Sequence, residues 1–128
     1  MATVTRIGDG DTLELGDGSR VRLVQIDAPE LGEGECYAPE AATALAELVP
    51  PGSTVGLERD AALDDVDRFG RLLRYVFRNG TNVNLELVRD GAAEVFFFRG
   101  DRGRYAAELL DAAGEARGAQ RGLWGACR

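Results

Sequence analysis

The segment TVTRIGDGDTLELGDGSRVRLVQI, residues 3–26, decides the fold, because it contains three short alternating stretches separated by two turns. Apolar and polar residues alternate over Thr3–Ile7, Thr12–Leu15 and Arg20–Ile26, as expected for strands with one buried face. The connections are rich in Asp and Gly, which suit tight hairpin turns. The alternation slips at Val24–Gln25, where we expect a bulge or bend. The segment therefore predicts a β-meander.

The rest of the chain mixes helices with short strands. The pattern predicts helices over Pro39–Val49, Asn82–Arg89 and Tyr105–Gly118, strands over Thr54–Arg59, Leu72–Phe77 and Ala93–Phe98, loops over Leu31–Tyr37, Asp60–Gly70 and Arg99–Gly103, and an apolar tail at Leu123-Trp124. Asn82 suits the N-cap of the second helix, and Gly91 suits its end. About five main strands and three helices in this order favour a small Greek-key barrel with helices outside.

Length and composition limit the class of protein. A chain of 128 residues that is 45% hydrophobic and 29% charged is expected to fold as one globular domain, residues 1–128. Its apolar runs are far shorter than the roughly 20 residues that cross a bilayer. No signal-peptide pattern begins the sequence, so any such segment would lie outside it.

The charge balance excludes some chemistry. The chain has 15 basic and 22 acidic residues, a net charge of −7, and neither histidine nor lysine. General acid or base chemistry must therefore fall to carboxylates, tyrosine or metal-bound water. Because an acidic chain lacks the long-range field that attracts nucleic acids, phosphate recognition would have to be local.

The two cysteines, Cys36 and Cys127, are too far apart in sequence for a redox pair or a zinc knuckle. Two alternatives stay open. In the first, the cysteines form a disulfide that fixes the C-terminal end of the chain, and this would favour an oxidising compartment. In the second, they are two reduced thiols.

Four carboxylates lie at turns and strand ends of the meander: Asp9 and Asp11 on the first turn, and Asp27 and Glu30 after the third strand. Clustered oxygen ligands without histidine fit calcium better than magnesium or manganese. The chain does not match an EF-hand loop, and an isolated Asp-Gly-Asp is more typical of an ordinary turn. Only the four carboxylates taken together favour a metal site.

Two arginines accompany these carboxylates. Arg22 precedes Asp27 on the same strand, and Arg71 follows a glycine in Asp67–Arg71. A forked guanidinium suits a phosphate and the charge that develops on it during attack. Taken singly, each arginine is more typical of a surface ion pair.

Four ordered motifs together resemble the staphylococcal nuclease (thermonuclease) family. They are Ile7–Thr12 (IGDGDT), Arg22–Glu30 (RLVQIDAPE), Asp67–Arg71 (DRFGR) and Asn82–Gly91 (NVNLELVRDG), and the similarity extends to Gly122–Trp124. The resemblance implies an OB-fold, a five-stranded Greek-key barrel with three α-helices, and a calcium-dependent phosphodiesterase that cleaves DNA and RNA, with single strands favoured, to leave 3′-phosphates.

The same resemblance implies roles for individual residues. Asp11 and Asp27 would bind Ca²⁺ with the backbone carbonyl of Ala28, and Asp9 would lie just outside the ligands. Glu30 would orient or deprotonate the attacking water. The resemblance assigns the scissile phosphate to Arg22 and Arg71, and further substrate contacts to Arg68 and Phe69.

Some residues depart from the family pattern. The family commonly has threonine at Ala28, and its best-known member has tyrosine at Phe69 and a longer, lysine-bearing loop at Leu31–Tyr37. We therefore expect substrate binding to be weaker and more sensitive to salt, or to be strengthened by other arginines such as Arg68. The three aromatic residues Phe96–Phe98 could stack on a base, but core packing is the favoured interpretation.

The main alternative is a catalytically silent module of the same fold that binds nucleic acid or protein. Retention of every implied catalytic residue argues against it. A calcium-binding or stability-driven acidic domain is a third interpretation, and a glycosidase using Asp27 and Glu30 is a distant fourth because it gives the arginines no task. We expect a monomer, secreted or otherwise outside the cytoplasm.

Overall fold

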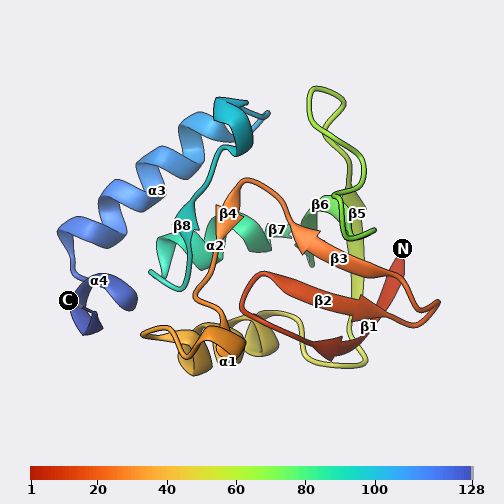
Figure 1. The fold of residues 1–128 in the computed structure, drawn as a ribbon, viewed down its shortest axis with the longest axis horizontal. Coiled ribbons are helices and arrows are strands. Elements are labelled where there is room, and N and C mark those ends of the chain that lie inside the picture. Colours follow the sequence, from red (N-terminus) through yellow and green to blue (C-terminus); the bar gives the residue numbers. More distant parts are fainter. Residues whose placement is uncertain (128) are drawn as a thin grey trace.

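Five strands form a closed barrel, shown with its surrounding helices in Figure 1. The computed structural model describes residues 1–127, so Arg128, the last residue of the predicted domain, lies outside the described part. The barrel strands are β1 (Ala2–Ile7), β2 (Thr12–Leu15), β3 (Arg20–Leu23), β5 (Thr54–Glu58) and β6 (Leu72–Arg78). They pair in the order β3-β2-β1-β5-β6, and parallel pairing of β3 with β6 closes the ring. The predicted OB-fold barrel is confirmed.

The predicted bend at Val24–Gln25 is confirmed as the point where the chain leaves the barrel. Strand β3 ends at Leu23, and Gln25 has a left-handed backbone with φ of 69°. The next two residues form β4 (Ile26–Asp27), which pairs with β8 (Glu94–Val95) in a separate small sheet visible in Figure 1. The bend therefore carries Asp27 out of the barrel wall.

The three predicted helices are present with small shifts at their ends: α1 (Ala38–Leu48), α2 (Val83–Arg89) and α3 (Ala106–Gly118). Asn82 caps α2 as expected, since its side chain accepts a hydrogen bond from the backbone N–H of Leu85. The sequence pattern did not predict β7 (Thr81–Asn82), the helix α4 (Leu123–Ala126), or the 3₁₀ turns η1 (Leu31–Glu33) and η2 (Phe98–Gly100). Within residues 1–127, no helix is both long and apolar enough to cross a membrane.

The predicted strand Ala93–Phe98 is wrong beyond Val95. Strand β4 offers only two residues for pairing, so β8 ends after Glu94–Val95 and the chain turns through η2. Phe96 and Phe98 are 45% and 53% exposed, so core packing was the wrong preference for them. Phe97 between them is half-buried.

One buried amide holds the barrel and α2 together. The side chain of Asn84 is fully buried within the apolar cluster that the barrel and helices share. Its Oδ1 accepts from the Val76 N–H at 3.0 Å, and its Nδ2 donates to the carbonyl oxygens of Val24 at 2.9 Å and Arg74 at 3.3 Å. Asn84 therefore satisfies backbone groups from two segments at once.

A second buried polar group, Asp60, lies at one end of the barrel. Its Oδ2 accepts hydrogen bonds from the Tyr75 hydroxyl and the Arg104 N–H, both at 2.8 Å, and its Oδ1 accepts from the Ala62 N–H. Burial alone would raise the pKa of Asp60, but these hydrogen bonds outweigh it and hold the pKa below its usual value. Burial and the Asp60 charge raise the pKa of Tyr75.

The two cysteines form a disulfide, with an S–S distance of 2.05 Å and a Cα–Cα distance of 5.9 Å. Cys36 ends the loop before α1, and Cys127 follows α4. The backbone N–H of Leu123 in α4 donates to the carbonyl oxygen of Gly91, just after α2. The bridge thus connects an exposed loop to the packed C-terminal end of the chain.

Candidate active site

The turn between β1 and β2 carries Asp9 and Asp11 against helix α1. A Cβ at Gly10 would lie 2.8 Å from the Cβ of Ala41, so only glycine allows this approach. Asp11 is only 4% exposed as a result. Its Oδ2 accepts from the Ala28 N–H at 2.8 Å, which fixes the start of the segment leading to Glu30.

Arg22 lies between the two predicted metal carboxylates. Its Nη1 donates to the carbonyl oxygens of Leu23 at 2.6 Å and Ile26 at 2.8 Å, and these bonds bind the guanidinium across the bend. Its Nη2 lies 3.4 Å from Asp11 Oδ2 and 3.5 Å from Asp27 Oδ1. Because both distances are to the same Arg22 nitrogen, the carboxylates of Asp11 and Asp27 lie close to each other.

These residues offer ligands of a chemistry that fits calcium. Asp11 and Asp27 supply carboxylate oxygens near each other, and Ala28 could add its backbone carbonyl. Among residues 1–127, no three acidic, cysteine or histidine side chains cluster as a metal site on their own. Burial raises the pKa of Asp27, Arg22 partly offsets this effect, and the charges of Asp11 and Glu35 raise the pKa further. The ligand set stays a prediction.

Glu30 lies on a loop that is hydrogen-bonded to the turn carrying Asp9. The side chain of Asp9 accepts a hydrogen bond from the Leu31 N–H at 2.9 Å, so the turn between β1 and β2 and the loop after Glu30 are directly connected. Glu30 is exposed. Within residues 1–127, its hydrogen bonds are made by its backbone N–H and carbonyl groups and not by its carboxylate. Desolvation raises the pKa of Glu30, and the charges of Glu33, Asp9 and Glu35 raise it further. A base at this position would be accessible to water.

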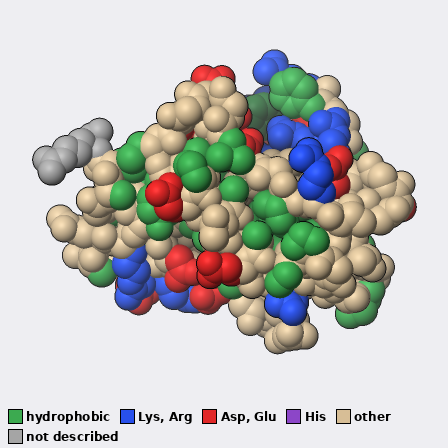
Figure 2. All heavy atoms as spheres, turned by 90° about the horizontal axis from the view of Figure 1, so that it is seen from below, with side chains coloured by type: hydrophobic (Ala, Val, Ile, Leu, Met, Phe, Trp, Pro, Cys, Tyr) green, Lys and Arg blue, Asp and Glu red, His purple; other side chains and the backbone are tan. Residues whose placement is uncertain are grey.

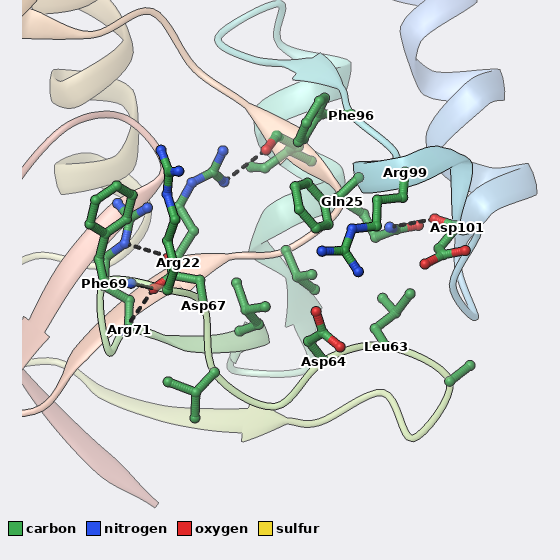
Figure 3. A pocket seen from close by; sticks show the side chains of 17 residues that line it. Arg22, Gln25, Leu63, Asp64, Asp67, Phe69, Arg71, Phe96, Arg99 and Asp101 are labelled. Carbon is green, nitrogen blue, oxygen red and sulfur yellow. Dashed lines mark hydrogen bonds and ion pairs between the residues drawn. The ribbon is translucent and has the colours of Figure 1, made fainter.

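A pocket of about 650 Å³ opens beside Arg22. Arg22, Phe69 and Arg71 line it, as Figure 3 shows. Arg68 also lines it, so four of the residues predicted to contact the substrate share one cavity. The pocket lining does not include Asp9, Asp11, Asp27 or Glu30. Arg22 is therefore the residue common to the carboxylate group and the pocket.

Asp67 holds Arg71 and Phe69 at the mouth of this pocket. Its side chain accepts from the backbone N–H groups of Phe69 and Arg71 and from Arg71 Nε at 2.7 Å. Burial alone would raise the pKa of Asp67, but these hydrogen bonds outweigh it and lower the pKa. The guanidinium groups of Arg68 and Arg71 lie 4.8 and 5.2 Å from the centre of the Phe69 ring. The predicted ion pair of Arg71 is present, and it also orients the guanidinium.

The opposite wall contains Arg99, which the sequence interpretation did not assign, and two aromatic residues for which it favoured core packing over base stacking. Phe96, Phe98 and Arg99 line the pocket, and the Arg99 guanidinium lies 4.9 Å from the centre of the Phe98 ring. Buried Gln25 holds this wall in place, because its Nε2 donates to the Asp101 carbonyl oxygen and its Oε1 accepts from the Gly103 N–H. The slip in alternation at Gln25 was the one sequence signal for this contact.

The pocket concentrates arginines locally on an acidic protein. On the face shown in Figure 2, basic side chains gather at the upper right beside an exposed hydrophobic side chain, with acidic side chains next to them. In the pocket, Arg68 and Arg71 share the half-exposed ring of Phe69 in the same way. Planar aromatic and guanidinium groups together can contact a base and its phosphate.

Comparison with known proteins identifies the family. The family described as "Staphylococcal nuclease homologue" matches residues 20–126. Protein ParB of Escherichia coli is 36% identical over 94% of this chain and 70% of its own length. An uncharacterized endonuclease of Escherichia coli O157:H7 is 38% identical over 94% and 74% of the two chains. The SPbeta prophage-derived endonuclease YokF of Bacillus subtilis is 32% identical over 95% of this chain and 43% of its own. This chain belongs to the staphylococcal nuclease homologue family.

Proposed function

We propose that this protein is a calcium-dependent nuclease that hydrolyses DNA and RNA, preferentially as single strands, and leaves 3′-phosphates. Membership of a nuclease family and relatives named as endonucleases support the coarser part, hydrolysis of phosphodiester bonds. The observation that carries the proposal is Arg22, which contacts both acidic residues proposed to bind the metal and also lines the arginine-rich pocket.

In the proposed reaction, a water oxygen forms a bond to phosphorus while the bond from phosphorus to the 5′-oxygen breaks. Glu30 takes the proton of the attacking water in this proposal, since the chain has no histidine and Glu30 is an exposed carboxylate on the loop that Asp9 contacts. The 5′-oxygen leaves and takes a proton from solvent water, and the phosphate stays on the 3′ side. Arg22 and Arg71 offset the negative charge that develops on the phosphate oxygens.

The proposed metal site is made of Asp11, Asp27 and the carbonyl of Ala28. A bound divalent cation there would supply positive charge beside the phosphate. Arg22 already partly neutralises both carboxylates at 3.4 and 3.5 Å, so the site combines a fixed cation with oxygen ligands. Asp9 is engaged with the Leu31 N–H and would act only from outside the ligand set.

The aromatic walls of the pocket support a preference for single strands. Phe69, Phe96 and Phe98 are each 45–55% exposed, and a base can stack on such a ring only when it is not paired in a duplex. Phe69 lacks the hydroxyl of the tyrosine that the best-known family member has at this position, so phosphate binding there would depend on Arg68 and Arg71. We propose secretion as well, which the disulfide supports because such bridges persist in oxidising compartments.

The first experiment is incubation of the purified protein with single-stranded DNA in calcium or in a chelator, with identification of the product ends. We expect cleavage in calcium only, with 3′-phosphate ends. A folded protein that cuts nothing with calcium, magnesium or manganese, but binds the DNA, would replace the proposal with a silent binding module.

The role of Glu30 is tested separately. Glu30→Gln should lower turnover by about 10²- to 10⁴-fold while calcium and nucleotide binding persist, because the amide cannot accept the proton. Glu33→Gln is the matched control, since Glu33 is an exposed acid on the same loop. Equal turnover of the two variants would remove Glu30 from the reaction.

A further inference from the structure

The side chain and the backbone of Glu35 both form hydrogen bonds to the backbone of Glu30, at the two ends of the loop before α1. The backbone N–H of Glu30 donates to Glu35 Oε1 at 2.7 Å, and the backbone N–H of Glu35 donates to the Glu30 carbonyl oxygen at 3.3 Å. Glu35 therefore engages both backbone polar groups of the proposed base. Its own side chain does not line the arginine pocket.

Packing does not hold this loop. Residues 30–36 are all exposed, and no residue of η1 is buried. The contacts that remain are polar: the Glu35 pair, the Leu31 N–H on Asp9, the Gly34 N–H on the Leu31 carbonyl, and the Ala38 N–H of α1 on the Glu35 carbonyl. With so few contacts, loss of one hydrogen bond should displace the backbone that carries Glu30.

The disulfide fixes the far end of the same loop. Cys36 directly follows Glu35 and is bonded to Cys127, whose backbone N–H donates to the Leu123 carbonyl oxygen in α4. Helix α4 is in turn held against the end of α2 through Gly91. The covalent bond thus ties the residue after Glu35 to the C-terminal end of the chain, and it adds to the hydrogen bond that the Ala38 N–H of α1 donates to the Glu35 carbonyl oxygen at 3.1 Å.

We propose that Glu35, held by the Cys36–Cys127 bridge, is a positioning residue that keeps Glu30 in place for catalysis. The inference rests on the proposed function of Glu30 and adds a residue that does not contact the substrate. In this positioning role Glu35 acts as a hydrogen-bond acceptor, while its charge separately raises the pKa of Glu30 and of Asp27. A displacement of about 1 Å in a catalytic group can cost on the order of 100-fold in rate.

Three variants separate these effects: Glu35→Ala removes the acceptor, Glu35→Gln keeps an oxygen acceptor without the charge, and Glu33→Ala removes a neighbouring charge only. Glu33 is a matched control because its charge also acts on Glu30. On single-stranded DNA in calcium, we expect Glu35→Ala to lower kcat by about 10- to 100-fold with KM nearly unchanged. Glu35→Gln should restore most of the rate, and Glu33→Ala should match the wild type.

Amide hydrogen exchange of Glu30, followed by NMR, gives a readout independent of activity. The Glu30 amide should exchange about 10-fold faster in Glu35→Ala than in the wild type or Glu35→Gln. The double variant Cys36→Ser/Cys127→Ser should also show faster exchange and a lower kcat, measured well below its melting temperature. Unchanged exchange in the double variant would overturn the part played by the bridge.

The outcomes distinguish this inference from the proposed function. Equal kcat for Glu35→Ala and Glu33→Ala, or a Glu35→Gln variant as slow as Glu35→Ala, would overturn the positioning role. A wild-type protein that cuts no nucleic acid would overturn the nuclease proposal, and the exchange measurement would still decide whether Glu35 holds the Glu30 backbone.

Discussion

The Cys36–Cys127 disulfide should be a large single contribution to stability. The two residues are 91 positions apart, so the bridge closes most of the chain into one loop. The loop-entropy relation assigns about 4.6 kcal/mol to a closed loop of that size, and bridges of this kind commonly contribute about 2–4 kcal/mol. Replacement of both cysteines by serine should therefore lower the free energy of unfolding by about 2–4.6 kcal/mol.

The corresponding change in melting temperature follows from the unfolding entropy. At about 2.1 cal/mol/K per residue, a chain of this length has an unfolding entropy of about 0.27 kcal/mol/K. The melting temperature should therefore drop by about 7–17 °C. Because the bridge acts mainly on the unfolded chain, the urea m-value should rise when it is opened, since the unfolded state becomes more expanded.

Calorimetry and urea unfolding of the wild type, with and without reductant, test this reasoning. The double serine variant is the control, because reductant should leave its melting temperature unchanged. A wild-type melting temperature that moves by less than about 2 °C on reduction would refute the stabilisation, and an unchanged m-value would refute its assignment to the unfolded state.

Three further predictions concern side chains fixed by hydrogen bonds. Asn84→Leu should cost about 4 kcal/mol in urea unfolding, because it leaves buried backbone groups unpaired; a cost under about 1 kcal/mol would contradict the bonding described above. Because the folded-state pKa of Asp60 lies below its unfolded value, its contribution to stability is present at neutral pH and is lost as the pH falls below about 3.8. Urea unfolding between pH 6 and 2 should show a weaker acid dependence in Asp60→Asn than in the wild type, and identical curves would contradict this assignment. Arg71→Gly should lower kcat/KM on DNA by at least about 10²-fold, because it removes a donor to the phosphate; a variant with lower stability but normal kcat/KM would make Arg71 purely structural.

The fold was predictable wherever local patterns decide it. Alternation located the barrel strands, and the Asn82 cap located α2, because both signals arise within a few residues. The prediction of a strand over Ala93–Phe98 was wrong because the length of that strand depends on β4. This partner lies about 70 residues earlier in the chain and offers only two residues for pairing. Apolar character alone could not show where that pairing ends.

The candidate site was predictable in its parts but not in its connections. The motifs named Asp11, Asp27 and Arg22, and the structure brings these three together at 3.4–3.5 Å. The motifs did not indicate that Gln25 would bond to the segment at Asp101, since that contact joins residues far apart in sequence. Nor did they assign Glu35, whose exposed position in an acidic loop is ordinary by composition.

The overall acidity of the chain changes how the pocket must work. With a net charge of −7, the protein gains no long-range attraction for a polyanion, so binding must come from groups already oriented at short range. Asp67 orients Arg71, and Phe69 lies against the guanidiniums of both Arg68 and Arg71. Such fixed donors need little reorganisation when charge develops on a phosphate, which is the condition under which electrostatic stabilisation is most effective. In the proposed nuclease, the pocket would therefore favour stabilisation of the transition state over tight capture of the substrate.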